Sequence, residues 1–196
     1  MSIRHRVRVR QVERRSSHFN RVDNTQLDWQ RSDGRWQPIE RETVDHGDGA
    51  VVLLYDPRRR TVVLLRQFRY ACFINGLDDL LVEAPAGLLD GASPEDCVRA
   101  EAEQEVGFRV RRPRQVFDAY MSPGSLCERL YGFVAEYDHD DRVGAGGGLL
   151  HEGEDIEVLE LPFDEALAML ADGRIRDAKT IMLLQYAALH LFPRRA

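Results

Sequence analysis

The stretch that decides the fold runs from Gly87 to Gly107 and reads GLLDGASPEDCVRAEAEQEVG. It is a glycine turn followed by a strong helix start. Ser93 stands at the N-cap, Pro94 takes the first helical position, and two acidic residues fill the first turn. Gly107 is placed to end the helix, because glycine readily adopts the left-handed conformation that closes helices. The segment therefore predicts one capped helix behind a tight turn.

Two neighbouring stripes run along that helix. The stripe expected to be buried consists of Val98, Ala102 and Val106, and the stripe beside it consists of Cys97, Glu101 and Glu105. Two carboxylates four residues apart repel each other by about 0.2–0.5 kcal/mol even when exposed, so beside a buried face they need a cation. Oxygen-rich clusters of this kind suit Mg²⁺ or Mn²⁺. The competing interpretation is that Glu101 and Glu105 are ordinary solvated charges on the helix surface.

The composition is that of an ordinary globular protein. The chain has 196 residues, 43% hydrophobic and 31% charged, which fits one domain or one domain with a modest appendage. Its three cysteines form no CxxC pair, so neither a zinc site nor a disulfide framework is indicated, and the cytoplasm is the expected location. The net charge of −6 argues against nucleic-acid binding, and no apolar run is long enough to span a membrane.

The pattern along the chain divides it into two parts. Residues 1–46 predict a small antiparallel sheet with little core of its own, with strands at 3–13, 18–31 and 35–46. Residues 47–196 predict an α+β domain in which strands mix with helices. Its expected strands lie at 51–55, 61–68, 80–84, 108–120, 128–137 and 156–161, and its further helices at 163–172 and 177–192.

The helix segment resembles the Nudix box, in which a glycine and a short loop precede a helix with the pattern Arg-Glu-x-x-Glu-Glu-x-Gly. Three runs are similar to the ADP-ribose and GDP-mannose pyrophosphatase branch of that superfamily: RQFR at 66–69, EAPAGL at 83–88 and YMSPG at 120–124. Three later runs look closest to the GDP-mannose pyrophosphatase subgroup: GGG at 146–148, EDIEV at 154–158 and GRIRDAKT at 173–180. The chain departs from the box in a loop one residue shorter, and in Ser93, Ala100 and Gln104, which stand where the box has glutamate, arginine and glutamate.

The resemblance implies the Nudix fold, an αβα sandwich around a mixed sheet, preceded by an N-terminal antiparallel sheet whose strands are exchanged across a homodimer. It implies Mg²⁺-dependent hydrolysis, with Mn²⁺ as an alternative, of a nucleoside diphosphate sugar to a nucleoside monophosphate and a sugar 1-phosphate. Two other hypotheses stay open. One is the same chemistry on ADP-ribose, and the other is a Nudix-fold sensor that binds a nucleotide sugar without cleaving it.

The same resemblance assigns roles to individual residues. It implies metal ligands at the carbonyl of Ala86 and the carboxylates of Glu101, Glu105 and Glu154, with Glu105 and Glu154 also catalytic and Glu152 a candidate general base. Expected substrate contacts are Arg41, Glu42, Arg69, Gly87, Leu88, Glu128 and Lys179. The glycines at 144 and 146–148 are expected to be lid hinges or a disordered connector. The alternatives are an acidic surface loop around Glu154 and ordinary surface ion pairs for the charged contacts.

Overall fold

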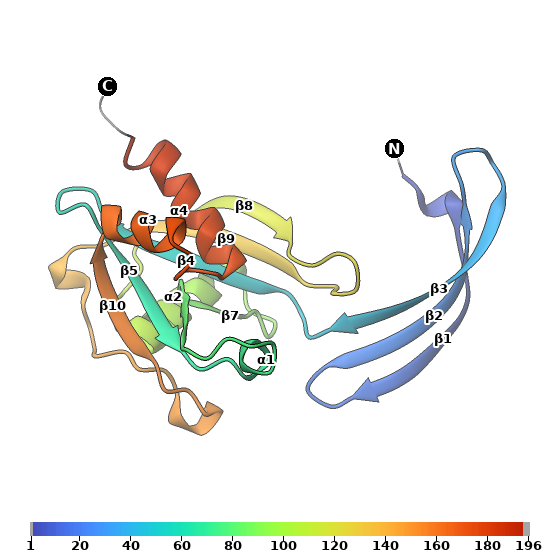
Figure 1. Ribbon diagram of the computed structural model, residues 1–196, viewed down its shortest axis with the longest axis horizontal. Coiled ribbons are helices and arrows are strands. Elements are labelled where there is room, and N and C mark those ends of the chain that lie inside the picture. The colour runs from blue at the N-terminus through green and yellow to red at the C-terminus, as the bar shows by residue number, and fades with distance from the viewer. Residues whose placement is uncertain (1, 194–196) are drawn as a thin grey trace. The chain divides into compact units, whose positions relative to one another are not determined.

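The computed structural model describes residues 2–193, which form two compact units. One unit contains the chain up to Asp48 together with Tyr120–Arg129, and the other contains Gly49–Ala119 and the chain from Leu130 onward. Each unit is described below by itself, and Figure 1 labels the elements of both.

The N-terminal unit is a three-stranded antiparallel sheet in the order β1 (Val7–Ser17), β2 (Arg21–Gln30) and β3 (Trp36–Asp45). The sheet was predicted, although a short 3-10 helix occupies Arg4–Arg6 where the first strand was expected to run. None of the described residues of this unit is buried. Cross-strand contacts hold it instead, such as Arg10 Nε to Asp28 Oδ2 at 2.7 Å and the Arg8 guanidinium 3.9 Å from the Trp36 ring centroid.

The larger unit is built on a seven-stranded mixed sheet. Its continuous path runs β10 (Glu157–Pro162), β5 (Thr61–Gln67), β4 (Gly49–Asp56), β9 (Arg129–Glu136) and β8 (Arg114–Tyr120). The short strands β6 (Leu81–Glu83) and β7 (Ala86–Leu88) complete it. β4 pairs in parallel with β9 and antiparallel with β5, so the sheet is mixed as predicted.

The central strands β4 and β5 separate part-way along their length. They pair with each other only where Leu54–Asp56 meets Thr61–Val63. Further along, Gly49–Val51 of β4 pairs with β7, and the last three residues of β5 pair with β6. The connection between β6 and β7 therefore starts beside one central strand and ends beside the other.

Helices cover both faces of this sheet. On one face, α2 (Pro94–Val106) packs Val98, Ala102 and Val106 against Ala50, Val52 and Leu54 of β4. Val51 and Leu53 are also buried, and they point to the opposite face because strand residues alternate. The helices α3 (Phe163–Ala171) and α4 (Ala178–His190) pack on β5 and β4 from that side (Figure 1). The predicted αβα sandwich is confirmed.

Two local predictions need correction. A short helix, α1 (Tyr70–Phe73), follows β5 where no element was expected. The strand expected over 108–120 begins only at Arg114. Phe108 and Val110 are buried in the core under α2, and Pro113 lacks the N–H that a ladder requires. The alternation of apolar residues at Phe108 and Val110 therefore reflects a loop whose side chains pack in the core, and not a strand.

The termini of α2 match the prediction. The Ser93 hydroxyl oxygen accepts a hydrogen bond from the Asp96 amide at 3.1 Å, and Gly107 closes the helix with φ +75°. Ser93, which departs from the Nudix box, is therefore the helix cap.

Candidate active site

Helix α2 carries Glu101 and Glu105 to strand β7. Glu105 is 1% exposed, and its Oε2 accepts a hydrogen bond from the Ala86 amide at 2.9 Å. Glu101 is half-buried over Gly87, where an added Cβ would lie 1.9 Å from Glu101 Oε1. A side chain at position 87 would therefore displace the Glu101 carboxylate from this position.

The glycine-rich segment before β10 brings in the third acidic residue. The Gly147 amide donates to the Glu105 carbonyl at 2.9 Å, and the Gly148 amide donates to the Gln104 carbonyl at 3.1 Å. Glu154 Oε2 accepts from the Leu149 amide at 2.8 Å, and a Cβ on Gly148 would lie 2.5 Å from that same oxygen. The glycines are bound to the last turn of α2, where the sequence suggested hinges or a disordered connector.

Burial and neighbouring carboxylates raise the pKa values of Glu101 and Glu105. Burial and then the charges of Glu154, Glu152 and Asp90 raise the pKa of Glu101 to about 7. Burial is also the main cause for Glu105, whose pKa rises to about 8 with help from Glu101 and Glu154 and against the Ala86 amide. Partly dehydrated carboxylates that repel one another form a place where a divalent cation is stabilising.

The donor set fits such a cation chemically, since it offers carboxylate oxygens beside the Ala86 backbone. Within residues 2–193, no three Asp, Glu, His or Cys side chains converge closely enough to enclose an ion in this arrangement.

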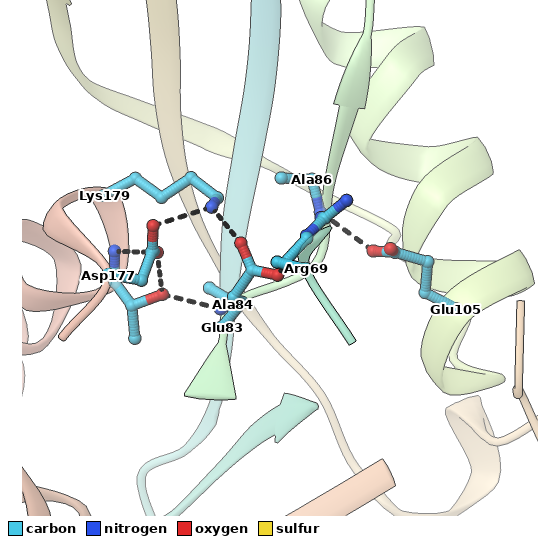
Figure 2. A network of polar contacts seen from close by, with 8 residues as sticks. Arg69, Glu83, Ala84, Ala86, Glu105, Asp177 and Lys179 are labelled. Atoms are coloured by element: carbon cyan, nitrogen blue, oxygen red, sulfur yellow. Dashed lines mark hydrogen bonds and ion pairs between the residues drawn. The ribbon is translucent and has the colours of Figure 1, made fainter. Parts of the chain in front are cut away.

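A second cluster, centred on Glu83 at the end of β6, lies beside the first (Figure 2). Glu83 Oε2 accepts from Arg69 Nε at 2.7 Å, and its Oε1 accepts from Lys179 Nζ at 2.5 Å. Lys179 also donates to Asp177 Oδ1 at 2.8 Å. Burial lowers the pKa of Lys179, but Glu83 and Asp177 raise it more, so the net shift is upward and the amine stays charged.

The Glu83 cluster is joined to the backbone that carries the proposed metal ligand. Asp177 caps α4 by accepting from the Thr180 amide at 3.0 Å. The Thr180 hydroxyl in turn accepts from the Ala84 amide at 2.7 Å. The start of α4 is thereby fixed to the chain two residues before Ala86.

The structure brings together most of the predicted site residues. Those in the larger unit near the two clusters are Arg69, Ala86, Gly87, Leu88, Glu101, Glu105, Glu154 and Lys179. Glu152 lies exposed in a 3-10 helix just before Glu154. Arg41, Glu42 and Glu128 belong to the N-terminal unit, where Arg41 donates to the Glu40 carbonyl at 2.8 Å.

Sequence reasoning assigned no role to Glu83, Asp177 or Thr180 in the site. A signal for Glu83 existed, because an acidic residue ends the apolar run Leu80–Val82 and a buried charge needs a partner. Its partners come from positions 69 and 179, and no spacing rule connects these to it.

The larger unit also has a cavity of about 870 Å³ away from these clusters. It lies at the other end of β4, between Tyr55, Arg58, Arg112 and Tyr137. None of the predicted site residues lines it. The size of a cavity alone therefore does not show where the predicted site residues lie.

Comparison with known proteins decides the family. The model of the NUDIX domain matches residues 45–184. This chain belongs to the Nudix family. It is 51% identical over 175 residues to the GDP-mannose pyrophosphatase of Pectobacterium atrosepticum, covering 89% of this chain and 90% of that protein. The enzymes of that name from Yersinia pestis (47% over 184 residues, 93% and 92% covered) and Escherichia coli (48% over 172 residues, 87% and 89% covered) are also similar.

The predicted membership of the Nudix superfamily, with its likeness to the GDP-mannose pyrophosphatase subgroup, is confirmed. Nudix hydrolases generally use divalent metal ions, which agrees with the donor set beside Ala86. The two remaining substitutions in the Nudix box, Ala100 and Gln104, are both exposed on α2. Neither leaves a buried charge without a partner. In residues 2–193, no helix is long and apolar enough to cross a membrane.

On the expectation that Glu154 is a metal ligand, Gly148→Ala should weaken metal binding. The added methyl would collide with Glu154 Oε2, so we expect Mn²⁺ affinity to fall at least about tenfold, by analogy with losses from disturbed ligand support. Gly173→Ala is the matched control, because Gly173 has a similar φ of +82° against +76° but nothing within 4 Å of an added Cβ. Both variants should lose similar backbone stability. Equal Mn²⁺ affinities in calorimetric titrations would contradict this account.

Metal-free protein should lose stability as the pH rises. The pKa values of about 7 for Glu101 and about 8 for Glu105 lie above the unfolded value, so the folded state binds more protons. The contribution of these two groups to stability is fully present below the unfolded value of 4.5 and is lost as the pH rises through the folded values toward about pH 8. Glu105→Gln should flatten the profile. Urea unfolding in chelator at several pH values measures this, and parallel profiles would refute it.

Proposed function

We propose that this Nudix protein hydrolyses the diphosphate of a nucleoside diphosphate sugar, with GDP-mannose as the first candidate. The products would be a nucleoside monophosphate and a sugar 1-phosphate. The observation that carries the proposal is the cluster of Glu101, Glu105 and Glu154 beside the cationic side chains of Arg69 and Lys179. The names of relatives that match at least 87% of this chain support the substrate class.

Mg²⁺, with Mn²⁺ as an alternative, is the proposed metal, and its ligands would be Glu101, Glu105, Glu154 and the Ala86 carbonyl. When bound, the metal neutralises phosphate charge and lowers the pKa of water. Arg69 and Lys179 would hold diphosphate oxygens, since a guanidinium fork and an ammonium both suit phosphate. Gly87 and Leu88 would offer backbone contacts on β7.

The bond that breaks joins one phosphorus to the bridging oxygen of the diphosphate. Water adds to that phosphorus, and its proton passes to a carboxylate. Glu152 is the proposed base because it is exposed in the loop that also holds Glu154. Arg41, Glu42 and Glu128 remain proposed substrate contacts supplied by residues of the N-terminal unit.

Glu101→Gln should lower kcat/KM at least about 100-fold, because a charge that acts in the transition state is lost. GDP-mannose, ADP-ribose and other nucleotide sugars are assayed with Mg²⁺ and phosphatase-coupled phosphate release. Glu103→Gln, an exposed change on the same helix, is the control and should resemble the wild type. Full turnover by Glu101→Gln would refute the site. A preference for ADP-ribose, or binding without turnover, would favour one of the two rival functions.

We also propose a cytoplasmic homodimer that exchanges N-terminal strands, with residues 1–46 as the dimerising part and 47–196 as the Nudix domain. The N-terminal sheet has no buried residue among those described, and Val9 and Val12 of β1 are 60% and 55% exposed. A sheet without a core is marginal alone and is stabilised by a partner. Light scattering should give a dimer for the full chain and a monomer for a chain that starts at Gly47. A monomeric full chain at micromolar concentration would contradict this.

A further inference from the structure

We propose that Glu83 is a positioning residue, which holds Arg69 and Lys179 in place to receive the substrate diphosphate. The inference rests on the proposed function, since it assigns those two cations to the diphosphate. Glu83 itself would not contact the substrate, because both of its oxygens are already bonded to the cations.

Glu83 divides its two carboxylate oxygens between two cations. Its side chain is only 4% exposed, and each oxygen takes one cation. Arg69 follows β5, and Lys179 lies in the first turn of α4, 110 positions later in the chain. A single carboxylate therefore fixes the distance between two positive groups that no shared element holds together.

The terminal amino groups of Arg69 stay available to bind a ligand. The hydrogen bond to Glu83 uses Nε, which leaves the two terminal amino groups of the guanidinium to bind a phosphate. The Arg69 side chain is 42% exposed. Burial lowers its pKa, but Glu83 raises it more, and Glu105 and Glu154 add to the rise. Arg69 thus lies within the field of the acidic cluster, between Glu83 and the Ala86–Glu105 contact (Figure 2).

The charges within the Glu83 cluster balance one another. Lys179 is 16% exposed and shared by Glu83 and Asp177, so two carboxylates balance two cations. Buried ion pairs are weak evidence for stability, because desolvation offsets much of their attraction. Such a cluster has a clearer use in binding. Cations already oriented by a carboxylate lose little conformational entropy when a phosphate arrives.

The test is Glu83→Gln in the full-length chain, which removes the charge and keeps the shape. Isothermal titration with GDP in chelator measures binding without metal, and GDP-mannose hydrolysis with Mg²⁺ gives kcat and KM. We expect Kd for GDP and KM each to rise at least about tenfold, and kcat to change less, because a lost orienting contact acts mainly on binding. Glu83→Asp keeps the charge but reaches less far, so it should recover part of the affinity.

Asp56→Asn is the matched control. Asp56 is also a buried carboxylate paired with an arginine, Arg59 Nε to Asp56 Oδ2 at 2.6 Å, but it lies at the other end of β4. It should lower the urea midpoint as Glu83→Gln does and leave Kd and KM near the wild-type values. If both variants weaken GDP binding equally, general destabilisation explains the effect and the proposal is wrong.

A double-mutant cycle with Arg69→Ala tests whether Glu83 acts through Arg69. We expect Glu83→Gln to change GDP affinity much less in the Arg69→Ala background, since non-additivity reports coupling. Undiminished effects there would overturn the proposal, and so would failure of both Glu83→Gln and Glu83→Asp to fold. A wild-type protein that binds GDP but hydrolyses no nucleotide sugar would refute the proposed function alone, because the titrations in chelator would still decide the role of Glu83.

Discussion

The architecture of this protein depends on burying the carboxylate of Glu105. The group is 1% exposed and has one backbone donor, the Ala86 amide. Burying an acidic side chain is costly unless it is hydrogen-bonded, so the edge of a strand must lie within hydrogen-bond distance of the helix that carries it. The separation of β4 and β5 provides that edge, because β7 can then pair with β4 directly beneath α2. The pairing of β7 with β4 and the packing of α2 therefore together determine the electrostatic environment of Glu105.

The acidic cluster and the Glu83 cluster differ in how their charges are compensated. Glu83 is paired with two cations, whereas Glu101 and Glu105 lie in the field of each other or of Glu154, and burial with these charges raises the pKa values of both. One side of the site is thus neutral and preorganised, and the other carries charge that a metal would balance. A diphosphate between metal and cations would meet positive charge from both directions. This contrast agrees with the Nudix assignment and with the separate tasks proposed for the two clusters.

Much of the fold could be predicted from local signals in the sequence. The cap at Ser93, the stop at Gly107 and the four-residue spacing of Glu101 and Glu105 are all determined within α2, and the structure agrees with each. The contacts of Glu83 could not be predicted, because they depend on residues that meet only after folding. The docking of the glycine-rich segment on α2 escaped prediction for the same reason. Glycine marks both free hinges and close contacts, and only the neighbouring backbone distinguishes them.

The attachment of Gly147 and Gly148 to the last turn of α2 also limits how the chain can vary in length. The amides of these glycines and the carboxylate of Glu154 are held at both ends of a short span, so an insertion between them would shift the third acidic residue away from the helix. The anchoring begins before these glycines, since the Asp141 carbonyl accepts from the Arg109 amide at 2.8 Å and the Val143 amide donates to the Gly107 carbonyl at 2.8 Å. Length variation among related chains should therefore be small from Asp141 to Glu154. The spacing is set by these backbone contacts together with Gly148, whose lack of a Cβ leaves room for the Glu154 carboxylate.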